Sequence, residues 1–129
     1  MIVYPESGYN SFVSVEEAHE YFTDRLNAGA WDAADQPAAL KTGFRSLATL
    51  DIVIDLSEAA ALQAIKDAQC EQALWESAYN RDEPAARGVA IGGLMSVQFF
   101  HQGNSERYAP RALELLRPYL RARTVSRIR

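Results

Sequence analysis

Residues 59–79 read AAALQAIKDAQCEQALWESAY, an alanine-rich stretch that decides the fold. At helical spacing its apolar residues spread over a wide arc of one helix surface. These residues are Leu62, Ile65, Ala68, Ala73, Leu74, Trp75, Ala78 and Tyr79. The charged residues Lys66, Asp67 and Glu71 are left mostly to one side. An arc this wide predicts a central helix with neighbours on more than one face, ended by the turn residues before Pro84.

Two helices are predicted before this stretch. Ser14 and Glu17 have the spacing of a capping box, in which each side chain bonds the backbone amide of the other residue. This cap predicts a helix over Val15–Asn27. Asp35 can cap a second helix that carries Pro37 in its first turn, where the missing amide proton costs nothing.

Further signals describe the packing and the end of the fold. Gly43 lies inside the second helix and indicates close packing there, since glycine costs about 1 kcal/mol relative to alanine in a helix. Residues 31–35 are interpreted as a short link, and residues 52–54 as either a helix end or an extended piece. Pro110 predicts the start of a last helix, and Pro118 weakens its final turn.

Residues 89–99 have a different pattern, with alternating apolar residues on both sides of a Gly-Gly pair. This pattern predicts a β-hairpin that packs on the helices or contacts a neighbouring subunit. Its apolar residues are Val89, Ile91, Leu94, Met95, Val97 and Phe99. The first dozen residues are rich in turn-forming and aromatic residues and predict an extended arm. The expected fold is therefore mainly α, a small bundle of about four helices with a β-hairpin and extended N- and C-terminal arms.

Positive charge is concentrated at the C-terminal end of the chain. Residues 107–129 contain seven arginines and one acidic residue, a net charge of +6, whereas residues 1–106 carry −10. We therefore expect a helical domain at residues 1–123 and a docking tail at residues 124–129, which has too few apolar residues to fold alone. The candidate docking residues are Arg121, Arg123, Val125, Arg127, Ile128 and Arg129.

Three interpretations of this tail remain open. It is a frayed terminus, a segment that docks into a groove of a partner protein, or a contact to nucleic-acid phosphates. The nucleic-acid interpretation would use aromatic residues as stacking platforms, namely Phe99, Phe100, Tyr108 and Tyr119. The use of arginine alone, with Val125 and Ile128 between the arginines, favours the protein groove.

Several classes of protein do not fit this sequence. With 129 residues the chain is one domain, and it has neither an apolar run that spans a bilayer nor the features of a signal peptide. Cys70 is the only cysteine and is expected in the core, without a disulfide. His19 and His101 have no further ligand at metal-binding spacing. No catalytic group of residues emerges either, so we expect a protein without enzymatic activity, metal or cofactor.

Three parts of the sequence resemble a family of small phage proteins. Residues 11–22, SFVSVEEAHEYF, followed by Trp31, are similar to the family's opening S-Y-V-S-x-x-E-A-x-x-Y-F…W. Residues 65–74, IKDAQCEQAL, resemble its V-K-x-A-x-x-E-x-A-L helix. The 89–99 segment and the Pro110–Leu120 helix, with its Leu-Arg-Pro-Tyr-Leu ending, match the same pattern. Such proteins are identified as head–tail adaptors of tailed phages and are often labelled DnaT-like single-stranded-DNA-binding proteins.

The resemblance implies a structural role in the virion, at the junction of head and tail. Adaptors of this family form a ring, twelvefold in the expected case, beneath the portal protein. Their C-terminal tails dock into the portal, a tail or stopper protein binds the other face, and genomic DNA passes through the lumen. The DnaT-like label implies the alternative, a single-stranded-DNA-binding protein of phage replication. The net charge of −10 on residues 1–106 favours the adaptor, because phosphate binding needs a positive surface.

Overall fold

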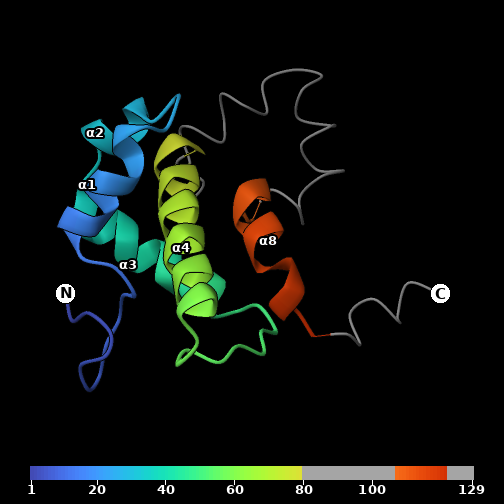
Figure 1. The fold of residues 1–129 in the computed structure, drawn as a ribbon. Coiled ribbons are helices and arrows are strands. Elements are labelled where there is room, and N and C mark those ends of the chain that lie inside the picture. Colours follow the sequence, from blue (N-terminus) through green and yellow to red (C-terminus); the bar gives the residue numbers. More distant parts are fainter. Residues whose placement is uncertain (80–106, 122–129) are drawn as a thin grey trace.

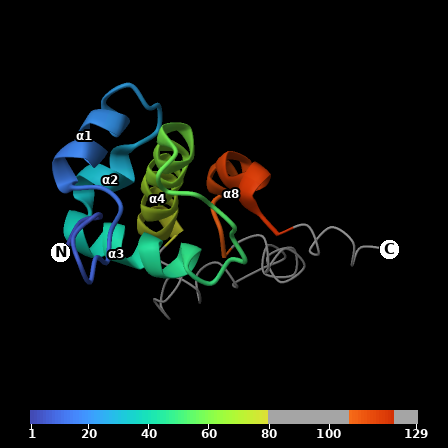
Figure 2. The ribbon, with the colours of Figure 1, turned by 60° about the horizontal axis from the view of Figure 1, so that its bottom comes forward.

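Helix α4 (Ala59–Tyr79) lies in the middle of the fold, as its apolar arc predicts (Figure 1). The computed structural model describes residues 1–79 and 107–121, and these parts of the chain are mainly helical. Helices α1 (Val15–Thr23), α2 (Gly29–Ala33) and α3 (Gln36–Leu47) lie on one side of α4. Helix α8 (Pro110–Leu116) and the 3₁₀ turn η1 (Arg117–Tyr119) lie on the other side, an arrangement that Figure 2 shows from a second direction. The helices form a small bundle around α4.

The capping box of α1 is present. The Ser14 amide donates to Glu17 Oε1 (2.9 Å), and the Glu17 amide donates to Ser14 Oγ (3.1 Å). The helix ends at Thr23 and not at Asn27, so the predicted end was wrong. Asn27 has a φ of 62°, in the left-handed region that interrupts a right-handed helix. The helix already ends at the Asp24 C-cap, whose φ of −106° and ψ of 16° are not helical, and Asn27 then turns the chain.

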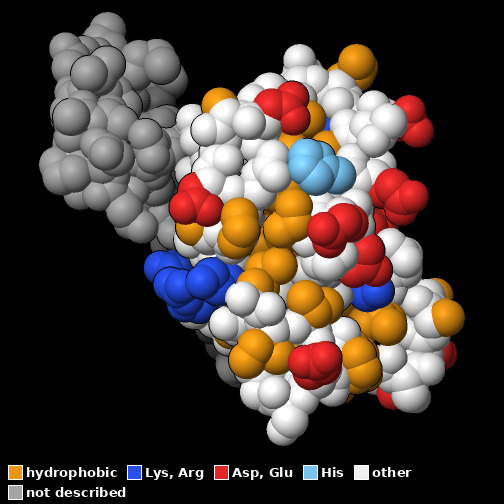
Figure 3. Space-filling model, turned by 90° about the vertical axis from the view of Figure 1, so that its left-hand side faces the viewer, with side chains coloured by type: hydrophobic (Ala, Val, Ile, Leu, Met, Phe, Trp, Pro, Cys, Tyr) orange, Lys and Arg blue, Asp and Glu red, His pale blue; other side chains and the backbone are white. Residues whose placement is uncertain are grey.

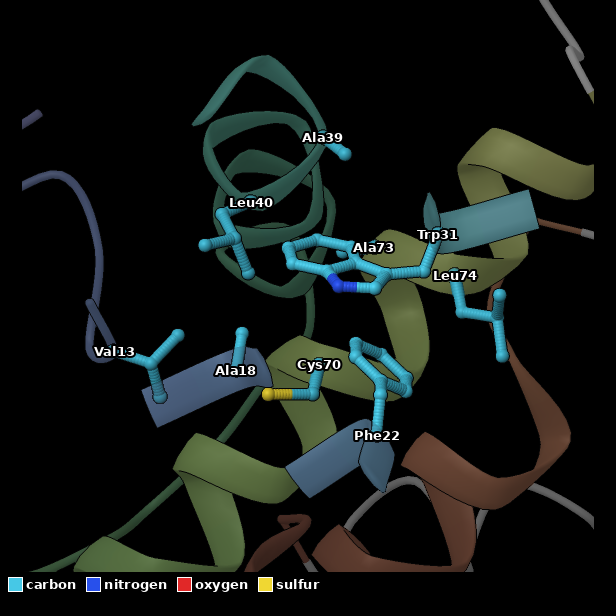
Figure 4. Close-up of a cluster of buried hydrophobic side chains, with 9 residues drawn as sticks. All are labelled: Val13, Ala18, Phe22, Trp31, Ala39, Leu40, Cys70, Ala73 and Leu74. Atoms are coloured by element: carbon cyan, nitrogen blue, oxygen red, sulfur yellow. The ribbon is translucent and has the colours of Figure 1, made fainter. Parts of the chain in front are cut away.

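Residues 31–33, predicted as part of a link, belong to helix α2, so that prediction was wrong. Helix α2 is a five-residue helix without a side-chain cap, and it carries the fully buried Trp31. Figure 4 shows Trp31 reaching from α2 into the space between Leu40, Phe22 and Ala73, which come from three other helices. The ring centres of Phe22 and Trp31 are 4.9 Å apart. Burial of this large ring stabilises a segment too short to be a stable helix alone.

Helix α3 begins and packs as predicted. Asp35 Oδ1 accepts a hydrogen bond from the Ala38 amide (3.3 Å), and Pro37 lies in the first turn. Gly43 faces α4 so closely that a Cβ atom there would lie 3.0 Å from the backbone nitrogen of Ala73 and 3.1 Å from the carbonyl oxygen of Gln69. The glycine lets the two helix backbones approach each other.

The core has two parts, one on each side of α4. The first joins α1, α2, α3 and α4, and its buried members are Val13, Ala18, Phe22, Trp31, Ala39, Leu40, Cys70, Ala73 and Leu74. The second joins the end of α3, the start of α4 and α8, and its buried members are Leu47, Ile65, Ala68, Ala109, Ala112 and Leu116. Helix α4 contributes to both, which confirms the prediction of a helix with neighbours on more than one face.

The N-terminal arm is not extended, which corrects the expectation from the sequence. Residues 1–12 fold back on themselves, because the Tyr4 amide donates to the Ser11 carbonyl (2.8 Å) and the Asn10 amide donates to the Ile2 carbonyl (2.9 Å). The loop is held against α3 by aromatic packing, with the rings of Phe12 and Phe44 centred 5.2 Å apart. Aromatic contacts of this kind stabilise a segment that has no regular secondary structure.

The predicted β-hairpin, Val89–Phe99, lies outside the described residues, and the fold gives it no support. Residues 1–79 and 107–121 contain no strand, only two isolated bridges. One bridge pairs Ile52 with Leu120, just after η1, and the Val53 amide donates to the Tyr119 carbonyl beside it (2.7 Å). Residues 52–54, left open by the sequence, are therefore extended and pair with the chain after α8.

The Gly43→Ala substitution should destabilise the protein by about 1–3 kcal/mol, because the added methyl group meets backbone atoms of α4 that cannot rotate away. Elsewhere in a helix the same substitution stabilises by about 1 kcal/mol. Urea unfolding followed by circular dichroism measures the difference. Gly29→Ala is the control, because a Cβ at Gly29 meets nothing within 4 Å. Equal or higher stability of Gly43→Ala would contradict the close packing of α3 and α4.

Candidate functional site

Gln69 is a polar side chain of α4 that is fully buried. Its Nε2 donates to the Leu40 carbonyl and to Ser11 Oγ, each at 2.9 Å. Its Oε1 accepts from the Phe12 amide at 2.7 Å. One amide group therefore ties α4 to α3 and to the N-terminal loop, and all its bonds are made inside the protein.

Gln72 likewise links α4 to another segment by hydrogen bonds, on the other side of the helix. It is fully buried, its Oε1 accepts from the Ala109 amide (2.8 Å), and its Nε2 donates to the Arg107 carbonyl (2.9 Å). The same Nε2 also donates to Glu76 Oε2 (2.9 Å), which accepts from Ser46 Oγ of α3 (2.6 Å). Gln72 fixes the start of α8 against the middle of α4.

Glu71 is the charged member of this buried group, with a side chain only 2% exposed. Arg25 holds it in a two-point pair, Nε to Oε2 at 2.8 Å and Nη2 to Oε1 at 2.9 Å, and the Tyr21 hydroxyl donates to Oε2. Burial raises the pKa of Glu71, but the hydrogen bonds from Arg25 and Tyr21 outweigh it and hold the pKa below its ordinary value. The sequence pattern puts Glu71 on the polar side of the helix, but its side chain is buried, so that prediction was wrong.

This buried group has the features of a structural network and not of a catalytic one. Glu71 is ionised and fully hydrogen bonded, and burial raises the pKa of the neighbouring Cys70 thiol, so neither is an activated base or nucleophile. Cys70 is in the core, as predicted. Its thiol has no role in an exposed site.

Arg121 is the one predicted docking residue that the structure describes, and it is paired with the body of the protein. Its Nε lies 2.6 Å from Asp51 Oδ1, and its amide donates to the Asp51 carbonyl (2.9 Å). Together with the bond from Val53 to Tyr119, these contacts fix Arg121, the last described residue, against the segment that follows α3. Arg123, Val125, Arg127, Ile128 and Arg129 lie outside the described residues, as do the six hairpin residues.

The surface over α1, α2 and α3 is rich in acidic groups (Figure 3). Red carboxylate side chains are spread over this face, while Lys and Arg side chains are few and the largest group of them lies near one edge. Exposed acidic residues of α1 include Glu16 and Glu20, and Asp24 follows at its C-cap. Among the described residues, the C-terminal arginines Arg111 and Arg117 belong to α8 and η1, which lie on the other side of α4 from this face.

A hollow of about 420 Å³ lies where α4 ends and α8 begins. Leu74, Trp75 and Ala78 line it from α4, and Ala109, Pro110 and Arg111 line it from the start of α8. Arg25, Asn27 and Glu71 complete its wall. The sequence analysis did not find this hollow, because its walls come from segments distant in the chain.

Glu71→Gln should lower the free energy of unfolding at neutral pH by about 2 kcal/mol, because Arg25 and Tyr21 lose a charged acceptor. A carboxyl with a lowered pKa stabilises the fold above its ordinary pKa of 4.5, and this stabilisation is lost as the pH falls below that value. The difference between the two proteins should therefore shrink below pH 4.5. Denaturant unfolding from pH 7 to pH 3 measures it, with Glu20→Gln, an exposed acid of α1, as the control. A constant difference over this range would contradict the pairing.

Arg121→Ala should change global stability by less than about 1 kcal/mol, because exposed ion pairs contribute little. It should nevertheless speed hydrogen exchange of the Val53 amide, which closes the bridge beside Arg121. Arg117→Ala removes the same charge from the neighbouring 3₁₀ turn and is the control. Unchanged exchange in the Arg121 variant would show that Asp51 and Arg121 do not fix the chain end.

Comparison with protein-family models, with curated proteins and with solved structures found no match to this chain. Over residues 1–79 and 107–121, no group of three or more His, Cys, Asp or Glu side chains is placed to hold a metal ion. In the same ranges no helix is long and apolar enough to cross a membrane.

Proposed function

We propose that this protein is a structural head-to-tail adaptor of a tailed-phage virion. Copies of the chain form a ring, expected to be twelvefold, that docks on the portal protein through the C-terminal tail. A tail or stopper protein binds the opposite face, and genomic DNA passes through the lumen. The proposal follows from the resemblance of residues 11–22 and 65–74 to phage adaptors, and the division of charge, −10 on residues 1–106 and +6 on residues 107–129, is the observation that supports it.

The anchoring of Arg121 supports this proposal. A tail that docks needs a fixed starting point, since a long flexible linker lowers the effective concentration of the docking group. The pair of Asp51 and Arg121, with the backbone bonds beside it, supplies that point at the end of the described chain. The docking group is then Arg123, Val125, Arg127, Ile128 and Arg129, with Arg121 holding it to the body.

The chemistry of the tail suits a groove in a protein. Each guanidinium can form two parallel hydrogen bonds with a carboxylate or bond several carbonyl oxygens. Val125 and Ile128 can fill apolar pockets between the arginines. The acidic body repels DNA phosphates, so DNA can move through a lumen lined by it without being held.

Deletion of Thr124–Arg129 should leave the helical fold intact and abolish binding to the portal protein of the same phage. Circular dichroism measures the fold, and co-sedimentation with assembled portal rings measures the binding. Replacing Arg123, Arg127 and Arg129 by lysine keeps the charge but removes the planar fork, and should weaken binding about tenfold or more. Arg117→Ala is the control for loss of a positive charge outside the tail. Full binding by the deletion variant would refute the docking role.

The alternative, a single-stranded-DNA-binding protein of phage replication, makes a different prediction. It requires micromolar or tighter binding to an oligonucleotide, weakened steeply by salt as counterions are released. The adaptor proposal predicts no such binding at 50 mM salt. Fluorescence anisotropy with a labelled oligonucleotide distinguishes them, and salt-sensitive micromolar binding would favour the alternative.

A further inference from the structure

Leu26 is the most exposed large hydrophobic residue in the described parts of the chain, with 81% of its surface open to solvent. It is nevertheless held in place. The Arg25 guanidinium that pairs with the buried Glu71 also donates to the Leu26 carbonyl, and the Arg25 amide donates to the Phe22 carbonyl. Asn27, with its left-handed backbone, turns the chain immediately afterwards. Because these bonds already fix the backbone of the turn, a partner that contacts Leu26 needs to order little additional backbone.

The hollow at the junction of α4 and α8 lies beside this turn, since Arg25 and Asn27 form part of its wall. Its apolar surface comes from Leu74, Trp75, Ala78 and Pro110. With about 420 Å³ of space, it can accept a leucine side chain. The exposed Leu26 therefore lies between two residues of the wall, beside a hollow whose lining is apolar on the α4 side and charged at Arg25, Glu71 and Arg111.

The turn that carries Leu26 and the hollow also carry charges of opposite sign. Asp24, exposed two residues before Leu26, gives the turn a negative charge, and Arg111 gives the hollow a positive one. Arg25 and Glu71 neutralise each other, so Arg111 sets the charge on the α8 side of this hollow. Glu114 lines a separate neighbouring hollow with Tyr21 and Arg111. This surface therefore carries both an apolar side chain with a negative charge and a hollow with a positive charge. Two copies of such a surface can fit each other, and a twofold interface requires this self-complementarity.

We propose that this surface binds a second copy of the chain about a twofold axis. Leu26 of each copy enters the hollow of the other, and Asp24 of each copy faces the partner's Arg111. The contact goes beyond the proposed adaptor function, because a ring is built from head-to-tail contacts between different surfaces. The proposed dimer forms when the protein is not assembled into the ring.

Light scattering at increasing concentrations of the full chain tests the pairing. The wild-type protein should form dimers, and Leu26→Ser should weaken dimerisation about tenfold or more. Val53→Ser is the matched control, since Val53 is also an exposed hydrophobic residue (57%) but lies beside Tyr119, at the other end of α8 from the hollow. Asp24→Arg should also weaken the dimer, and adding Arg111→Asp in the same chain should restore it.

Cysteine cross-linking locates the contact. The native Cys70 is buried, so introduced thiols react selectively. A Leu26→Cys chain mixed with an Ala78→Cys chain should form a disulfide between the two chains, and a Val53→Cys chain mixed with Ala78→Cys should not.

Three results would overturn the proposal: a wild-type protein that stays monomeric at about 100 µM, dimerisation of Leu26→Ser equal to that of the wild type, or cross-linking from Val53→Cys equal to that from Leu26→Cys. A monomer whose Ala78→Cys thiol is protected would show that the hollow is filled by another part of the same chain. Portal binding by Leu26→Ser reports separately on the adaptor function.

Discussion

Gln69 makes three hydrogen bonds to two distant segments while fully buried, and the arrangement of the bundle depends on such bonds. A helix with neighbours on several sides must either be apolar all round or satisfy its polar groups internally. Helix α4 takes the second course. Gln69 bonds to α3 and the N-terminal loop, Glu71 bonds to Tyr21 of α1 and to Arg25 just after α1, and Gln72 bonds to the start of α8. Apolar burial supplies most of the stability, and these bonds decide which segment lies on which side.

The same network links the fold to its surfaces. Arg25 neutralises Glu71 and at the same time braces the turn that exposes Leu26. Gln72 fixes the start of α8, and α8 leads through η1 to the pairing of Arg121 with Asp51. Arg121, the last described residue, is thus positioned by a continuous series of contacts from the centre of α4. A docking tail attached at Arg121 would have a defined origin on a rigid body.

Structural features that depend on residues close together in the chain were predictable from the sequence. The caps at Ser14 and Asp35, the start of α8 at Pro110 and the close approach at Gly43 all depend on local chemistry. Helix α2 was missed because five residues carry no periodic signal. The roles of Gln69, Glu71 and Gln72 were missed because polar residues on a helix are usually solvated, and these have partners 29 to 58 residues away. Of the predicted docking site, only Arg121 falls within the described chain.

The central claim is that this chain is a component of the head–tail connector, and counting it in the virion tests this most directly. Quantitative mass spectrometry of purified virions from the source phage, with isotope-labelled reference peptides, gives its copy number relative to the portal protein. The account predicts equal copy numbers of the two proteins. Absence of the chain from virions that contain a full portal would contradict it.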